Sequence, residues 1–225
     1  MPGGKITIAI DGPSGAGKST ISRLLAQELG IIHIDTGAMY RAITYKALVK
    51  GIDLTDEKKL TELALDTNLE IIPARGDRPQ AILLDGKDVT REIRSKAVNE
   101  HVSEVAKVAG VRSRLLHLQR KLAAEHSVIM DGRDIGTVVL PSADYKFFLT
   151  ADLETRAARR YQEIFGDQGD CAEFESVKQN LAERDLIDSS REFAPLRQAK
   201  DAILIDTTDL TISEVIEKIK GYLCR

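Results

Sequence analysis

The sequence has few of the residues that build disulfide frameworks and metal clusters. Cysteine occurs only at Cys171 and Cys224 in 225 residues, and no Cys-x-x-Cys pair is present. Neither a disulfide-stabilised fold nor a zinc site is expected. The net charge is only −3, from 32 basic and 35 acidic residues, which disfavours a protein that coats a nucleic acid polymer by charge alone.

Long hydrophobic runs are also absent. No segment approaches the roughly 18 apolar residues of a membrane span. The first residues, MPGGKITIAID, lack the pattern of a secretory signal. We therefore expect a cytoplasmic protein with no membrane partner. No coiled-coil seam is visible, which favours a monomer, and the 43% hydrophobic content supports one α/β domain with a sizeable core.

Short apolar runs alternate with helical patterns along the chain. Each run is too short for a helix and ends near a turn or polar residue, which predicts five strands joined by helices in a parallel sheet that is covered on both faces. After the first run, Ile21, Leu25 and Leu29 recur at helical spacing and Gly30 marks the helix end; Thr211 and Glu214 form a capping box for the last helix. The predicted strands are 5–11, 31–35, 128–131, 145–149 and 202–206.

Residues 69–89 break this alternation. Short β-like runs surround Pro, Gly and Asp-Gly turn signals, which predicts a small antiparallel insert. The following stretch, 90–124, has a helical pattern. GDQGD at 166–170 is typical of a mobile loop between two helices.

The segment GPSGAGKS contains Gly12, Gly17, Lys18 and Ser19 in the pattern G-x-x-x-x-G-K-[ST], between a predicted strand and a predicted helix. Backbone N–H groups of such a loop surround phosphate, the lysine reaches the β- and γ-phosphates, and the serine hydroxyl ligates Mg²⁺. We expect ATP or GTP at this loop.

Two uses of the nucleotide remain open at this point: phosphoryl transfer to a small acceptor, or a switch that changes partner binding. A GTPase switch would carry Asp-x-x-Gly and Asn-Lys-x-Asp segments, and neither occurs. A kinase requires a second anion site and arginines that neutralise the transferring phosphoryl group.

Polar residues follow the second and third strands of the predicted core. Thr36 and Arg41 lie in DTGAMYRA, and Asp131, Arg133 and Asp134 lie in DGRDIGTVV. Because parallel strands place their carboxyl ends at one edge, where such sheets bind ligands, both segments are candidates for the acceptor site. For Asp131 we weigh a role in orienting Mg²⁺-bound water against simple capping of the turn.

Two helical segments add basic residues. Arg184, Asp188 and Arg191 share one helix face at spacings of four and three, a pattern that is also typical of a solvated, salt-bridged surface. Arg156 and Arg160 share a face of the helix before GDQGD, where they either close onto ATP or lie in solvent. His33, His101, His117 and His126 show no metal spacing and are expected to be ordinary core or surface residues.

These segments together resemble the bacterial cytidylate kinases of the nucleoside monophosphate kinase group, over about residues 6–219. The resemblance implies a P-loop NTPase fold and transfer of the γ-phosphoryl group of ATP to CMP or dCMP, with Mg²⁺. It also implies one kinase domain over 1–225. This domain divides into a core (about 1–64, 100–154 and 172–225), a monophosphate-binding insert (about 65–99) and a short lid (about 155–171).

Site roles follow from the resemblance residue by residue. Thr36, Arg41 and Arg133 would hold the acceptor phosphate; Ser103, Arg112 and Asp134 would bind cytosine; Arg184 and Asp188 would contact the sugar, with Arg191 near the transferring phosphates. Lys18, Arg133, Asp134 and Arg191 form the catalytic set. The ATP set is Gly12, Pro13, Ser14, Gly15, Ala16, Gly17, Lys18, Ser19, Thr20, Arg156 and Arg160.

Two alternatives remain open on sequence. One is a related kinase with another acceptor, such as UMP, dTMP or shikimate. The other is a nucleotide sensor that binds but transfers nothing.

Overall fold

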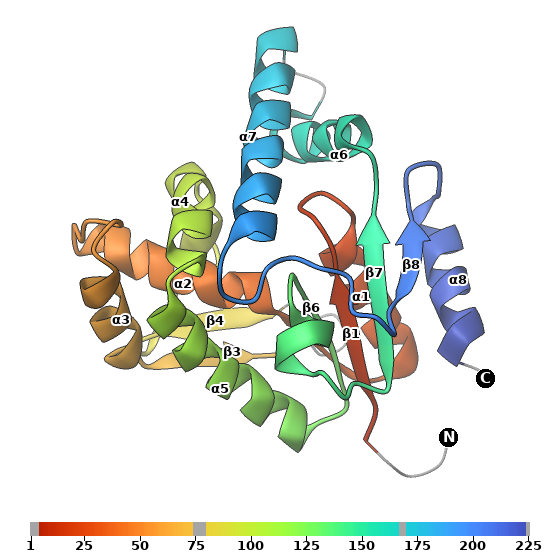
Figure 1. Ribbon diagram of the computed structural model, residues 1–225, viewed down its shortest axis with the longest axis horizontal. Coiled ribbons are helices and arrows are strands. Elements are labelled where there is room, and N and C mark those ends of the chain that lie inside the picture. Colours follow the sequence, from red (N-terminus) through yellow and green to blue (C-terminus); the bar gives the residue numbers. More distant parts are fainter. Residues whose placement is uncertain (1–4, 74–79, 167–169, 224–225) are drawn as a thin grey trace.

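The computed structural model describes residues 5–73, 80–166 and 170–223. Within these ranges the central element is a five-stranded parallel sheet with strand order β2-β6-β1-β7-β8 (Figure 1). All five strands predicted from the sequence are present, so the predicted parallel sheet is confirmed. The strands are β1 (Thr7–Asp11), β2 (Ile32–Asp35), β6 (Val128–Gly132), β7 (Tyr145–Thr150) and β8 (Ile203–Asp206).

Two helix ends follow the signals that predicted them. Gly30 closes α1 in a left-handed conformation with φ of 67°. Before α8, Thr211 Oγ1 accepts from the Glu214 backbone N–H, and the Glu214 carboxylate accepts from that of Thr211. The α-helices are α1 (Lys18–Leu29), α2 (Thr36–Val49), α3 (Glu57–Leu65), α4 (Lys96–Ala106), α5 (Ala109–Glu125), α6 (Leu153–Phe165), α7 (Cys171–Ser190) and α8 (Ile212–Leu223).

Helices cover both faces of the sheet because successive side chains of each buried strand alternate between the faces. Ile8 and Ile10 of β1 belong to the core cluster that includes residues of α1 and α8. Ala9, between them, belongs to a second cluster with Ala123 of α5 and with η2 (Ile135–Val139), a π-helical turn. Apolar side chains therefore cover both faces of β1, and polar side chains that could bind a ligand are left at the strand ends.

The predicted insert is a three-stranded antiparallel sheet, with β3 (Leu69–Ile72), β4 (Ala81–Leu84) and β5 (Lys87–Asp88) in that order. Asp85 and Gly86 both have positive φ, as the Asp-Gly turn signal predicted. Leu69 and Leu84 belong to a third core cluster that also contains Met39 of α2. This small sheet is thereby packed onto the helices beside the central sheet.

The stretch 90–124 is helical but not continuous. A 3₁₀ turn, η1 (Glu92–Arg94), precedes α4, and Val108 separates α4 from α5 with an extended backbone. Val108 is 1% exposed, so the break places another apolar side chain in the core. Helix propensity alone did not predict this break, because it is tertiary burial that favours it.

Some predictions concern residues outside the described ranges. They include the turn residues 74–79, the middle of the GDQGD loop at 167–169, the first four residues and Cys224. Gly166 and Asp170, at the two ends of that loop, do lie between α6 and α7 as expected. No helix in the described part of the chain is long and apolar enough to cross a membrane.

Two helical glycines provide a matched stability test. A Cβ on Gly110 of α5 would lie 2.2 Å from Thr61 Oγ1 of α3, whereas one on Gly221 of α8 would meet nothing within 4 Å. Gly110→Ala should therefore lower the free energy of unfolding by about 1–3 kcal/mol. Gly221→Ala should leave it unchanged or raise it by up to about 1 kcal/mol. Urea denaturation would measure the free energy of unfolding of both variants. Equal values for Gly110→Ala and Gly221→Ala would contradict the close packing of α3 on α5.

Candidate active site

The phosphate loop follows β1 and leads into α1. Gly12 has φ of 147°, and a Cβ there would lie 1.9 Å from the Leu149 carbonyl oxygen. Gly17, at the start of α1, has φ of 83°. Both backbone conformations strongly favour glycine and let the loop turn tightly before α1. The loop N–H groups and the positive end of the α1 dipole therefore lie close together.

Lys18 lies buried inside this loop. Its Nζ donates a hydrogen bond to the Pro13 carbonyl over 2.7 Å. Burial, reinforced by the positive charge of Arg133, lowers the pKa of Lys18 to about 7 against the opposing effect of Asp131. A phosphate group bound in the loop would supply a negative charge that stabilises the protonated form of Lys18.

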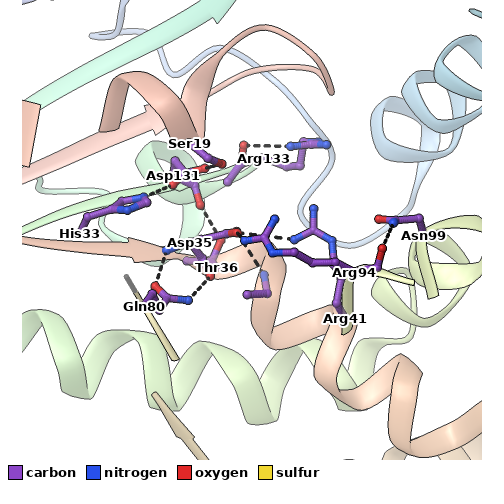
Figure 2. Close-up of polar contacts among 12 residues, drawn as sticks. Ser19, His33, Asp35, Thr36, Arg41, Gln80, Arg94, Asn99, Asp131 and Arg133 are labelled. Carbon is purple, nitrogen blue, oxygen red and sulfur yellow. Dashed lines mark hydrogen bonds and ion pairs between the residues drawn. The ribbon is translucent and has the colours of Figure 1, made fainter. Parts of the chain in front are cut away.

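Ser19, Asp131 and His33 form a chain of hydrogen bonds at the carboxyl ends of β2 and β6 (Figure 2). Ser19 Oγ donates to Asp131 Oδ2 over 2.6 Å, and His33 Nε2 donates to Asp131 Oδ1. Burial alone would raise the pKa of Asp131, but the hydrogen bond and charge of His33, together with Ser19, hold it below its usual value. Hydroxyl and carboxylate oxygens are the donors that Mg²⁺ prefers, so Ser19 and Asp131 fit the predicted metal role.

Thr36 and Arg41 lie in the first turns of α2, directly after β2. Thr36 Oγ1 donates to the Asp131 carbonyl over 2.8 Å. Asp35 caps the helix by accepting from the Ala38 N–H, and its Oδ2 lies 3.6 Å from Arg41 Nη1. Arg41 Nη1 is buried and has no hydrogen-bond partner among the described residues, so it is available to an anion in the cavity.

Arg112 and Asp134 are directly paired. Arg112 Nη2 donates to Asp134 Oδ2, and its Nη1 donates to the Ala106 carbonyl over 2.9 Å. The Arg112 guanidinium also lies 5.3 Å from the centre of the Tyr40 ring. These contacts fix the guanidinium and the carboxylate side by side, and the buried Ser103 of α4 lines the same cavity.

Arg133, Arg184, Asp188 and Arg191 converge beside this pair, because Arg191 Nη2 lies 3.8 Å from Asp134 Oδ1. Arg133 Nε donates to Asp188 Oδ2 over 2.7 Å, and Arg191 Nη1 lies 3.5 Å from Asp188 Oδ1. Arg184 and Asp188 are buried on α7, which excludes the solvated surface considered from the sequence. One detail differs from the prediction: α7 ends at Ser190, so Arg191 caps the helix and reaches the cavity from an extended backbone.

A single cavity of about 570 Å³ joins these groups. Among the residues predicted from the sequence, it is lined by Ser14, Gly15, Ala16, Gly17, Lys18, Ser19, Thr20, Thr36, Arg41, Ser103, Arg112, Asp131, Arg133, Asp134, Arg160, Arg184, Asp188 and Arg191. The phosphate loop and the predicted acceptor residues are therefore two parts of one continuous site.

Comparison with known proteins agrees with this arrangement. Residues 8–224 match the family model described as cytidylate kinase. The chain belongs to the cytidylate kinase family. It is 51% identical to the cytidylate kinase of Alkaliphilus oremlandii, with 97% of each chain covered. It is 53% identical to that of Desulforamulus reducens, with 94% of each covered.

Solved structures share the fold of this cytidylate kinase family member at lower identity. An uncharacterized protein from Eubacterium ventriosum superposes with a TM-score of 0.54 at 15% identity, covering 97% of this chain and 98% of the other. A gluconokinase from Sinorhizobium meliloti gives 0.50 at 17% identity, covering 98% and 92%. Together with the observed sheet, these likenesses confirm the predicted fold class.

Three of the residues predicted to bind ATP do not line the cavity of this cytidylate kinase family member: Gly12, Pro13 and Arg156. Arg156 is buried, and its Nη1 donates to the Ser14 carbonyl over 3.2 Å and to Asp185. Its observed contact with the phosphate loop is thus to the loop backbone. Arg160 does line the cavity, and so does Arg159, which the sequence placed on the same basic helix but which was not assigned to the ATP set.

Sequence reasoning also missed other residues of the site. His33 was expected to be an ordinary histidine but is hydrogen-bonded to Asp131. Asp35 also lines the cavity but was assigned no role, and its only signal in the sequence was its polar side chain at the end of a predicted strand. Arg159 donates to the Thr207 carbonyl over 2.6 Å. The cavity is also lined by Thr207, Leu210, Thr211, Ile212 and Val215. The signal for Arg159 was its position next to Arg160 in a basic helix.

The cavity carries an excess of positive charge. Within the part of the chain that the structure describes, the buried guanidinium nitrogens Arg41 Nη1, Arg184 Nε and Arg191 Nη2 have no hydrogen-bond partner. Burial and the charges of Arg133 and Arg41 lower the pKa of Arg184 to about 10. The lining includes the basic residues Lys18, Arg41, Arg94, Arg112, Arg133, Arg159, Arg160, Arg184 and Arg191, and the acidic residues Asp35, Asp131, Asp134, Glu163 and Asp188.

Polyphosphate should therefore stabilise the folded protein. Inorganic tripolyphosphate supplies negative charge to the unpartnered N–H groups and binds only the folded state. At about 100 times its Kd it should stabilise the protein by about 2.7 kcal/mol. Differential scanning fluorimetry would measure the rise in Tm, with NaCl of equal ionic strength as control. A rise no larger than that given by NaCl would contradict an anion site in the cavity.

Proposed function

We propose that this chain transfers the γ-phosphoryl group of ATP to CMP or dCMP, forming ADP and CDP or dCDP. The observation that carries the proposal is the continuous cavity, which contains a phosphate loop, an arginine-rich centre and the Arg112–Asp134 pair. The names of the relatives that are about 50% identical support the same activity.

The donor would bind at the phosphate loop. Lys18 would contact the β- and γ-phosphates, and Ser19 would ligate Mg²⁺, with Asp131 orienting a metal-bound water. When bound, the metal would neutralise charge on the phosphates. Arg160 would approach ATP from the cavity side, and Arg156 would act on ATP through the backbone of the loop. Gly12, Pro13, Ser14, Gly15, Ala16, Gly17 and Thr20 would complete the donor site.

The acceptor would bind across the carboxyl ends of β2 and β6. Its phosphate would contact Thr36, Arg41 and Arg133, and Arg191 would lie near the transferring group. Arg184 and Asp188 would contact the sugar. In this arrangement the arginines neutralise the charge that spreads over the phosphoryl group during transfer.

Ser103, Arg112 and Asp134 would bind the base. Cytosine carries an amino donor at N4 and acceptors at N3 and O2, so a carboxylate and a hydroxyl suit the first and a guanidinium the others. Uracil has an oxygen at position 4 and a proton on N3. It would therefore face repelling or unpaired groups, at a cost of several kcal/mol or about 10³-fold or more in discrimination.

Transfer would be direct and in line. A phosphate monoester is mostly ionised near neutral pH, so its oxygen attacks the γ-phosphorus without a strong general base. The protein would position the two substrates and stabilise charge, while closure over them excludes water.

We further propose that the kinase domain consists of a core, an insert over about 65–99 and a lid over about 155–171. The insert and the lid would close over the two substrates. A cytoplasmic monomer is proposed as the working form. The three-stranded sheet within the insert and the buried contacts of the core support this division.

The first test is ADP release from Mg-ATP with CMP, dCMP, UMP, dTMP, AMP and shikimate offered separately. Turnover should be strong with CMP and dCMP only, because only cytosine matches the Arg112–Asp134 pair. Strong turnover with another acceptor would indicate a related kinase. Tight ATP binding with no turnover on any acceptor would indicate a nucleotide sensor.

Lys18→Ala and Arg133→Ala should each lower kcat/KM by about 10²-fold or more, because each removes a charge that stabilises the transferring group. Arg197→Ala, which changes an exposed arginine, serves as the control and should match the wild type. Steady-state kinetics would measure all three. Normal turnover by folded Arg133→Ala protein would mean that the acceptor phosphate binds elsewhere.

Asp134→Asn should mainly relax the choice of base. It keeps an oxygen near Arg112 but removes the negative charge that suits the N4 amino group, so the ratio of kcat/KM for CMP over UMP should fall about tenfold or more. Asp134→Ala should relax the choice too, but it also leaves Arg112 without its carboxylate partner and is expected to be less stable. An unchanged ratio in Asp134→Asn would remove Asp134 from base recognition.

A further inference from the structure

Arg94 reaches the acceptor end of the cavity from the segment between β5 and α4. It is the last residue of η1, and its side chain lines the cavity although it is 59% exposed. Its guanidinium lies 3.6 Å from Asp35 Oδ2. Figure 2 shows this group pointing toward Asp35 beside the guanidinium of Arg41. None of the roles assigned above includes Arg94.

The single carboxylate of Asp35 forms ion pairs with two arginines, Arg41 and Arg94. The same oxygen, Oδ2, lies 3.6 Å from Arg41 Nη1 and 3.6 Å from Arg94 Nη2. Both separations exceed hydrogen-bond length, so these are ion pairs without hydrogen bonds. The other carboxylate oxygen, Oδ1, accepts from the Ala38 N–H at the start of α2. The two guanidinium groups therefore converge beside a single negative charge, and further negative charge would be bound favourably between them.

The backbone beneath Arg94 is held firmly. Ile93 is 1% exposed within the core cluster that contains α2 and the small sheet. Asn99 Nδ2 donates to the Arg94 carbonyl over 2.8 Å. Because the backbone is anchored and the side chain is largely exposed, the guanidinium can change partner by side-chain rotation alone.

We propose that Arg94 is a ligand of the acceptor's 5′-phosphate. Before the nucleoside monophosphate binds it pairs with Asp35, and afterwards it shares the phosphate with Arg41. The inference rests on the proposed function, because it assigns a residue to the acceptor of that reaction. A planar guanidinium suits a phosphate better than a single carboxylate oxygen at 3.6 Å, since it can donate two parallel hydrogen bonds. The phosphate contact also links the acceptor to α4, which begins two residues later and carries Ser103.

The test compares Arg94→Ala with Arg91→Ala, a matched control in which an exposed arginine three residues earlier, outside the cavity lining, is removed. Isothermal titration calorimetry would give the Kd of each protein for CMP, for cytidine and for ATP. Arg94→Ala should weaken CMP binding by about 10-fold or more, as expected for loss of a charge-assisted hydrogen bond. It should leave cytidine and ATP binding unchanged. Arg91→Ala should match the wild type for all three ligands.

Kinetics supply a second readout. In Arg94→Ala the KM for CMP should rise about 10-fold while the KM for ATP stays constant, and Arg94→Lys should recover part of the loss because the charge is kept. Unchanged CMP binding in folded Arg94→Ala overturns the inference. An equal loss for CMP and cytidine also overturns it, because that pattern indicates a structural role. If the wild type binds ATP but not CMP, the proposed function fails and this inference fails with it.

Discussion

Buried positive charge in excess of its carboxylate partners is the feature on which the site depends. Guanidinium groups from α2, α5, α7 and the turn after β6 enclose the cavity, and Asp35, Asp134 and Asp188 are shared among them. Taking charges out of water is costly unless partners are present. The folded protein therefore bears a destabilising charge imbalance that a polyanionic ligand relieves.

The central sheet makes this concentration of charge possible. Its strands are filled with apolar side chains on both faces, so the polar residues gather where the strands end. β1 leads into the phosphate loop, β2 ends at Asp35, and β6 carries Asp131 next to its last residue, Gly132. Three short segments far apart in sequence therefore meet at one edge because the strands are parallel and adjacent.

The acidic residues position the basic ones before any ligand binds. Asp134 holds Arg112, and Asp188 holds Arg133, each in direct contact. His33 and Ser19 fix the Asp131 carboxylate in the same way. Side chains that are already oriented lose less conformational freedom on binding. For this reason the same carboxylates that limit repulsion between the arginines also orient them for phosphoryl transfer.

Local pattern in the sequence determined the five strands, the phosphate loop with Gly12 and Gly17, the Asp-Gly turn and the caps at Gly30 and Thr211, because each depends on neighbouring residues alone. The resemblance added Ser103 and Arg112 to the residues that line the cavity and suggested roles for the others. Tertiary structure alone decided which groups meet across the chain. His33 faces Asp131, Arg94 faces Asp35, Arg156 donates to the Ser14 carbonyl of the phosphate loop, and Val108 interrupts a helical stretch. These features depend on burial and on charges contributed by distant segments, and no local pattern in the sequence contains that information.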